Sequence, residues 1–127
     1  MAKQAIQTNK APQPGGAYSQ AWRAGDFVYT AGMGANDPAT GALVGNTIEE
    51  QTRQTLDNIK AALEATGATL ADVIKVTTHL SDLKDFGGYN TVYATYFSDP
   101  RPSRTTVGSQ LANGMLIEVD VVAYLGK

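Results

Sequence analysis

The chain has 127 residues, 43% of them hydrophobic, which suits one folded domain with a substantial core and argues against a disordered segment. Its 10 Lys and Arg residues and 12 Asp and Glu residues give a net charge of -2, which disfavours general affinity for nucleic acid or an anionic membrane surface. The absence of cysteine and the single histidine exclude disulfides, thiolate catalysis, Cys-based zinc sites and multi-histidine metal sites.

We also expect no targeting segment or membrane helix. The N-terminal residues lack the apolar core of a secretory signal, and no apolar run approaches the roughly 20 residues of a membrane helix. We therefore expect a single domain over residues 1–127, located in the cytoplasm and without a membrane partner.

Short strands are predicted in the first thirty residues. An apolar patch around Ala5 and Ile6 precedes the turn-rich residues 12–16, which indicates an edge strand followed by a loop. Residues 18–23 alternate large and small side chains, and a Gly-Asp turn connects them to the apolar residues 27–30. This pattern predicts a β-hairpin.

A long polar connection follows over residues 32–46. It contains Gly32-Met33-Gly34, which has two of the three glycines of a dinucleotide-binding fingerprint. The third glycine is missing and the next predicted helix begins more than ten residues later, so we exclude a dinucleotide site.

The first helix is predicted from a capping box. Thr47 is followed three residues later by Glu50, and Gly67 supplies a left-handed stop at the other end. Residues that recur at helical spacing define one packed face. They are Thr52, Thr55, Leu56, Ile59, Ala62 and Leu63.

Residues 73–80 are predicted to form a strand with two different faces. Ile74, Val76, Thr78 and Leu80 would share one face, and Lys75, Thr77 and His79 the other. His79 has no partner in the sequence that would make it a base, so we interpret it as an ordinary sheet histidine.

A second helix is expected from about Asp85, which is a plausible N-cap. Its aromatic stripe is typical of a core-facing surface; the stripe consists of Phe86, Tyr89, Val92, Tyr93, Tyr96 and Phe97. Gly87-Gly88 in the first turn indicates close packing there. Asn90 lies at the edge of the stripe, so its amide needs a hydrogen-bond partner, either in the backbone or in a site.

The prolines of the stretch 100–107 prevent a helix from running through Arg101, and the β-branched residues after Pro102 favour a strand. Arg104 therefore lies on a strand. A guanidinium fork in such a place either forms an edge salt bridge or binds a carboxylate or phosphate through two parallel hydrogen bonds.

The last predicted strand covers residues 115–124. Glu118 lies inside it, between apolar residues, where a carboxylate needs a partner or a pocket. If the chain were a monomer, a solvated antiparallel face would be the preferred explanation of this glutamate.

The element order implies a mixed sheet with both helices on one face. Two helices cannot cover both faces, yet several strands carry apolar residues on both. Self-association over the uncovered face is the natural consequence, and it would place Glu118, Lys75 and His79 in or near a subunit interface.

Motifs spread over nearly the whole chain are similar to those of one family. They are Gly16-Ala17-Tyr18-Ser19-Gln20, Asp37-Pro38-Ala39-Thr40-Gly41, Gln51-Thr52-Arg53-Gln54 with Asn58, Asp82-Leu83-Lys84-Asp85-Phe86 with Asn90, Arg101-Pro102-Ser103-Arg104-Thr105, and Ile117-Glu118-Val119. The chain resembles the RidA/YjgF enamine and imine deaminases. The resemblance implies a chorismate-mutase-like α+β fold and a homotrimer with three sites between subunits.

The resemblance also implies an activity, the hydrolysis of 2-aminoacrylate and its 2-imino tautomers to 2-oxo acids and ammonia, with no metal or organic cofactor. Arg104 would bind the substrate carboxylate, Glu118 would hold and activate water, and Tyr18 and Asn90 would line the pocket. Tyr18 joins the two charged residues in the catalytic set, and the candidate substrate-binding residues are Arg104, Asn90, Gly32 and Thr106. The expected partners are small 2-imino and 2-oxo carboxylates and further copies of the chain, with no nucleic acid.

The chain departs from the usual family motifs around the pocket. Ala17, the stretch 31–35, Thr106 and Leu111-Ala112 stand where typical members have proline, Ser-Gly-Gln-Ile-Pro, cysteine and Leu-Pro. Two alternatives to the deaminase stay open. One is a non-catalytic metabolite-binding or chaperone-like trimer; the other is the ribonuclease or translation-inhibitor role of some relatives, against which the acidic charge balance counts.

Overall fold

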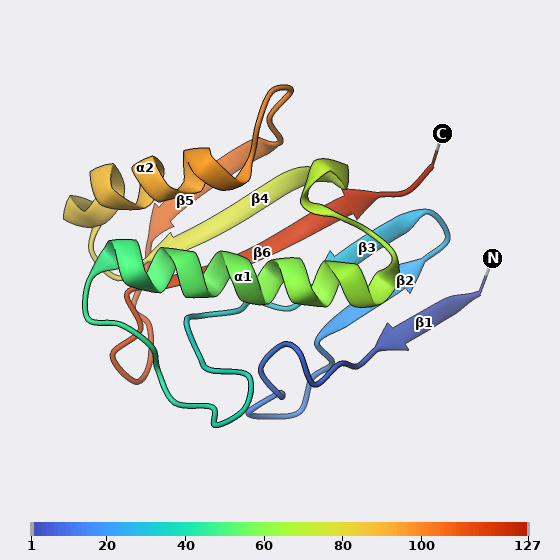
Figure 1. Ribbon diagram of the computed structural model, residues 1–127, viewed down its shortest axis with the longest axis horizontal. Coiled ribbons are helices and arrows are strands. Elements are labelled where there is room, and N and C mark those ends of the chain that lie inside the picture. Colours follow the sequence, from blue (N-terminus) through green and yellow to red (C-terminus); the bar gives the residue numbers. More distant parts are fainter. Residues whose placement is uncertain (1, 127) are drawn as a thin grey trace.

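The computed structural model describes residues 2–126, which form a mixed six-stranded sheet and two α-helices (Figure 1). The strands are β1 (Lys3–Ile6), β2 (Ala21–Ala24), β3 (Phe27–Thr30), β4 (Val73–Leu80), β5 (Ser103–Gly108) and β6 (Ile117–Tyr124). Their order across the sheet is β1-β2-β3-β6-β4-β5, with β4 and β5 parallel and the other neighbours antiparallel. The predicted N-terminal edge strand and the β2–β3 hairpin are confirmed, and β5, which carries Arg104, is the other edge.

Helix α1 (Ile48–Thr66) begins and ends as the sequence predicts. The Thr47 hydroxyl accepts a hydrogen bond from the Glu50 backbone N–H, and the Glu50 carboxylate accepts one from the Thr47 N–H, each at 3.2 Å. Backbone N–H groups of Asn46 and Thr47 hold the pKa of Glu50 below its ordinary value. Gly67 ends the helix with φ of 92°, a conformation that glycine adopts without steric cost.

Helix α2 (Phe86–Tyr96) follows a short 3-10 turn over Leu83–Asp85, and a similar turn, Leu70–Asp72, precedes β4. Asp85 is the N-cap residue, as predicted, although its side chain makes no capping hydrogen bond. The predicted close packing is found at Gly88, where a Cβ atom would lie 2.7 Å from Cγ2 of Ile48 at the start of α1. Within residues 2–126, neither helix combines the length and the apolar character that a bilayer crossing requires.

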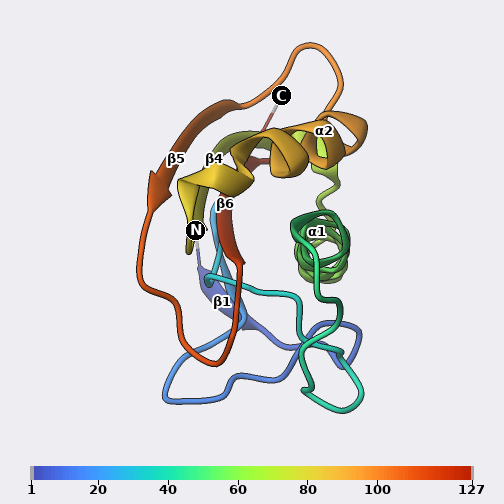
Figure 2. The ribbon, with the colours of Figure 1, turned by 90° about the vertical axis from the view of Figure 1, so that its left-hand side faces the viewer.

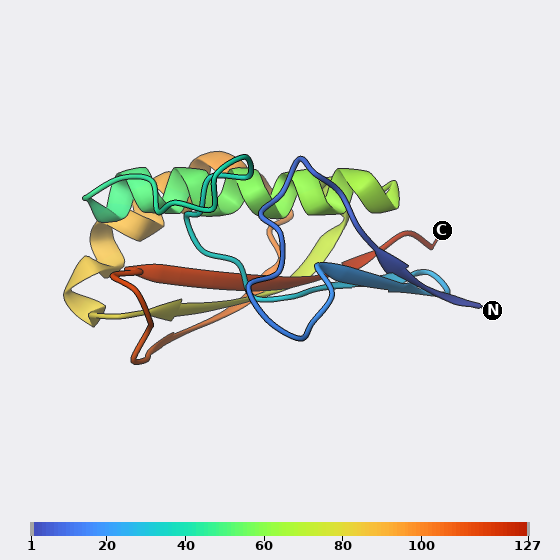
Figure 3. The same ribbon diagram turned by 90° about the horizontal axis from the view of Figure 1, so that it is seen from below.

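Both helices lie on the same face of the sheet (Figures 2 and 3). The core forms between this face and the helices, and most of its fully buried members come from α1, α2, β4 and β6. Examples are Leu56, Ile59, Leu63, Tyr89, Val76, Leu80, Ile117 and Val119. The predicted mixed α+β architecture is confirmed. No helix of residues 2–126 covers the opposite side of the sheet, which we call the open face.

The prediction of the two faces of β4 is wrong at the start of the strand. Ile74 was predicted to share a face with Val76, which is buried, but Ile74 is 46% exposed, whereas Val73 is buried. A β-bulge against β6 lies between Val73 and Lys75 and shifts the alternation by one residue there. From Val76 to Leu80 the predicted faces are confirmed, and His79 lies on the open face.

Two predicted strands begin later than expected. Residues 18–20 belong to a loop, and β2 begins at Ala21. Strand β6 begins at Ile117, because the preceding N–H group of Leu116 donates to the side-chain oxygen of Gln51 (2.9 Å) instead of to a strand. A side-chain acceptor thus ends the β6 ladder that the alternating sequence would continue.

Candidate functional site

Arg104 projects from the edge strand β5 toward helix α2. Its neighbour in the parallel ladder is Val76, which is buried beneath the helices, so both side chains share the helix-covered face. The Arg104 Nη1 atom donates a hydrogen bond of 2.8 Å to the side-chain oxygen of Asn90 on α2. The sequence analysis left open whether the hydrogen-bond partner of the Asn90 amide is the backbone or a site residue. In the structure this partner is the candidate site residue Arg104.

Aromatic rings of α2 hold the rest of the guanidinium. The Cζ atom of Arg104 lies 4.6 Å from the ring centroid of Tyr93 and 5.4 Å from those of Phe86 and Tyr89. Each cation–π contact contributes about 0.5–1 kcal/mol at an exposed site and more when desolvated. The ion pairs formed within residues 2–126 do not include Arg104. An internal salt bridge therefore does not explain this arginine, and its fork is oriented yet electrostatically unpaired.

Tyr93 has a second property that suits this place. Its hydroxyl is buried and has no hydrogen-bond partner within residues 2–126. Burial raises the pKa of Tyr93 to about 12, with Tyr89 acting in the same direction and Arg104 against it. The ring therefore stays neutral at physiological pH and does not neutralise the guanidinium charge.

Thr106 faces α2 from the same strand as Arg104. Its hydroxyl lies 3.2 Å from the Tyr89 hydroxyl, which donates to the Thr78 hydroxyl at 2.8 Å. Where typical family members have a cysteine, this chain therefore has a hydroxyl cluster that joins α2, β4 and β5. Arg104, Asn90 and Thr106 together form the arginine half of the candidate site.

The glutamate half lies at a different place. A cavity of about 330 Å³ is lined by Glu118, Gly32 and Tyr18, together with residues of three loops. The loops cover residues 7–20, 31–47 and 109–116, and Figure 1 shows them gathered on one side of the molecule, below α1. Glu118 is half-buried, and within residues 2–126 its carboxylate takes part in no ion pair and accepts no hydrogen bond. A carboxylate in such a position is available to a ligand or to water.

Gly32 makes room for Glu118. A Cβ atom at this position would lie 3.0 Å from Cδ of Glu118 and closer still to one carboxylate oxygen, which a real side chain does not tolerate. The glycine is therefore needed where the carboxylate approaches the backbone.

Three buried amide side chains pin the loops around this cavity. Gln20 donates to the carbonyl of Pro12 (2.8 Å), Gln51 donates to Gly45 (3.2 Å), and Asn58 donates to Gly34 (2.9 Å). All three side chains are at most 2% exposed. Since a buried amide without partners is costly, these bonds hold the loops in one arrangement.

Sequence reasoning named these amides only as family motif residues and assigned them no role. Gln51 and Asn58 lie on the apolar face of α1, which is the signal that could have revealed them, because a polar residue there must have partners. The role of the α2 rings as a platform for Arg104 was also missed, since an aromatic stripe at helical spacing is ordinarily core.

Within one chain, the structure does not bring the two halves together. Arg104 shares the helix-covered face with Val76, whereas Glu118 alternates with the buried Ile117 and Val119 and therefore projects from the open face. Tyr18 and Gly32 accompany Glu118; Asn90 and Thr106 accompany Arg104. A ligand that touches both charged groups would have to lie between two chains.

The fold and these half-sites define a class: an α+β protein with an unpaired arginine on an edge strand and an unpaired carboxylate on the open face of its sheet. Residues 8–125 match the family described as Endoribonuclease L-PSP. The chain belongs to this family, the RidA/YjgF family, and the resemblance inferred from the motifs is confirmed.

Individual relatives cover nearly the whole chain. It is 49% identical over 125 residues to a RutC family protein of Pyrococcus abyssi, with 98% of each chain covered. It is 37% identical over 125 residues to the 2-iminobutanoate/2-iminopropanoate deaminase of Rattus norvegicus, with 98% of this chain and 91% of that protein covered. The crystal structure of RidA from the Antarctic bacterium Psychrobacter sp. PAMC 21119 is similar with a TM-score of 0.92 and 40% identity, covering 95% of this chain and 98% of that one.

Proposed function

We propose that this protein hydrolyses small 2-imino acids, such as 2-iminopropanoate and 2-iminobutanoate, to 2-oxo acids and ammonia. Water adds its oxygen to the imine carbon, the carbon–nitrogen bond breaks, and the nitrogen leaves as ammonia with the protons that water supplies. The reaction needs a fixed cation for the substrate carboxylate and a positioned water with a proton acceptor.

The observation that carries the proposal is the pair of unpaired charged groups, Arg104 and Glu118. Arg104 would bind the substrate carboxylate through its planar fork, with Asn90 and the α2 rings holding the guanidinium in place. Glu118 would hold the water and accept its proton, and Tyr18 would line the same pocket. The deaminase names of relatives at 36–40% identity support this assignment.

A homotrimer would complete the site. Arg104 lies on an edge strand, which can pair with or pack against another chain. The open face exposes large side chains whose burial in an interface is favourable, among them Trp22, Tyr29 and Tyr124. A neighbouring chain that covers this face could bring its arginine half against the glutamate half of the first.

We expect light scattering coupled to size exclusion to give a mass of about three chains at micromolar concentration. A stable monomer over that range would contradict both the trimer and the site between subunits.

The direct test of the proposed function is ammonia release from freshly generated 2-iminopropanoate, with the buffer-only rate subtracted. Saturable, enzyme-dependent hydrolysis supports the deaminase. Carboxylate binding without turnover would instead support a metabolite-binding trimer. The family description names an endoribonuclease, and RNA cleavage by protein freed of contaminating nuclease tests that reading, although the net charge of -2 does not favour it.

Replacing Gly32 with alanine should displace the Glu118 carboxylate from the cavity. We expect kcat/KM for 2-iminopropanoate to fall by about tenfold or more, since displacements of about 1 Å from the productive geometry have effects of up to a hundredfold. The matched control is Gly87→Ala, where a new Cβ atom meets nothing within 4 Å. If both variants keep wild-type activity, Glu118 does not act from this position.

A further inference from the structure

His79, the one histidine of the chain, lies directly opposite Glu118 in the sheet. The two residues are Cα partners on the antiparallel strands β4 and β6, and both side chains are on the open face. Directly opposed residues on one face of such a pair have Cβ atoms about 4.5–5.5 Å apart. Histidine is also the side chain whose charge ordinarily changes near neutral pH.

The imidazole is anchored on its other side. Its Nδ1 atom lies 2.7 Å from the Ser109 hydroxyl, and the Ser109 N–H donates to the Leu80 carbonyl (2.9 Å), which ties the serine to the end of β4. Within residues 2–126, Nε2 has no hydrogen-bond partner. Nδ1 therefore orients the ring through Ser109, and Nε2 is free to exchange protons.

The charges around the ring come mainly from β6. Glu118 is opposite, and Asp120 lies diagonally, opposite Thr77. Burial raises the pKa of Asp120 above its ordinary value, and His79 acts in the opposite direction. On β4 itself, Lys75 donates to the Thr105 hydroxyl (2.8 Å), and the β5 residue beside His79 is the uncharged Val107.

We propose that His79 is a positioning residue for Glu118: its protonated ring, oriented by Ser109, keeps the opposing carboxylate ionised and able to accept a proton from water. This inference rests on the proposed function, in which Glu118 accepts a proton from water. A positive charge opposite a carboxylate favours its ionised form, so the charge of His79 would support Glu118 as a base. His79 thus extends the active range toward lower pH.

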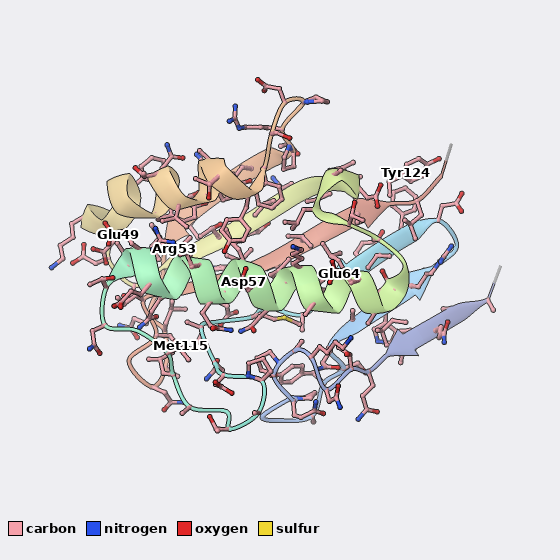
Figure 4. All side chains as sticks on the ribbon, viewed as in Figure 1. Glu49, Arg53, Asp57, Glu64, Met115 and Tyr124 are labelled. Atoms are coloured by element: carbon pink, nitrogen blue, oxygen red, sulfur yellow. The ribbon has the colours of Figure 1, made fainter. Side chains whose placement is uncertain are left out.

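The coupling can be measured without any assay of activity. In a protein labelled with 15N-histidine and freed of any histidine tag, one set of ring signals reports the titration of His79. Glu118→Gln removes a negative charge that favours the imidazolium, so the titration midpoint should move to lower pH. Glu64→Gln is the matched control, because Glu64 is exposed on the outer side of α1 (Figure 4).

Two further variants separate the partners. Ser109→Ala should change the balance of the two ring tautomers, because the bond to Nδ1 is lost. If Asp120→Asn moves the midpoint and Glu118→Gln does not, His79 is coupled to Asp120 and the proposal is overturned. An unchanged midpoint in both would make His79 an ordinary sheet residue, which overturns the proposal equally.

The pH dependence of activity is the second test of the proposal. In His79→Gln, which can still bond to Ser109 but cannot titrate, the acid limb of the kcat profile should move to higher pH by an amount similar to the NMR shift, since the coupling is reciprocal. An acid limb that stays in place in an active enzyme would overturn the proposal. If the chain does not deaminate imines, the NMR arm still decides the coupling, so the two failures are distinguishable.

Discussion

The Glu118→Gln variant should lose activity by about a hundredfold or more while its fold and assembly stay intact. The amide keeps the shape and most of the hydrogen-bonding capacity of the carboxylate, but it cannot accept a proton. A hundredfold is the usual scale for a lost general acid or base. We expect the loss in kcat for 2-iminopropanoate, with KM changed by no more than a few-fold, since in the proposed site Arg104 would still bind the carboxylate.

Stability should be nearly unaffected, because Glu118 takes part in no ion pair or hydrogen bond within residues 2–126. The midpoint of thermal unfolding of Glu118→Gln should stay within about 3 °C of that of the wild type. Glu64→Gln, the same chemical change on the outer side of α1, is the control for both measurements (Figure 4). Near-normal activity in Glu118→Gln, after subtraction of the uncatalysed rate, would assign proton handling to water or the backbone.

The second large effect is expected for Arg104→Lys. Lysine retains the positive charge and can still contact the α2 rings, but it loses the planar fork that binds a carboxylate through two parallel hydrogen bonds. A hydrogen bond to a charged group contributes about 1.5–3 kcal/mol, so kcat/KM should fall by about tenfold to a hundredfold, mainly through KM.

The matched control is Arg53→Lys, on the outer side of α1, where the arginine side chain is exposed (Figure 4). Light scattering should give the same mass for both variants as for the wild type. If Arg104→Lys hydrolyses 2-iminopropanoate at the wild-type rate, the arginine has a structural role through Asn90 and the aromatic rings.

Local signals were sufficient for most of the fold. The capping box of Thr47 and Glu50 and the stop at Gly67 defined α1, because these interactions form between residues close in sequence. Alternation likewise separated Val76, Thr78 and Leu80 from Thr77 and His79 on the two faces of β4, as the structure has them. It failed at Ile74, because a bulge depends on how two strands from distant parts of the chain pair.

The candidate site could be predicted from the sequence only in part. The presence of Arg104 and Glu118 on strands follows from proline positions and alternation, and their chemistry follows from their side chains. Sequence alone could not show that they lie on opposite faces of the sheet, since that depends on how β5 pairs with β4 beneath α2. It also could not choose the partner of Asn90, the rings around Arg104, or the alignment of His79 with Glu118. These contacts join residues far apart in the chain, and only strand register and helix packing, which the whole core decides together, bring them into reach.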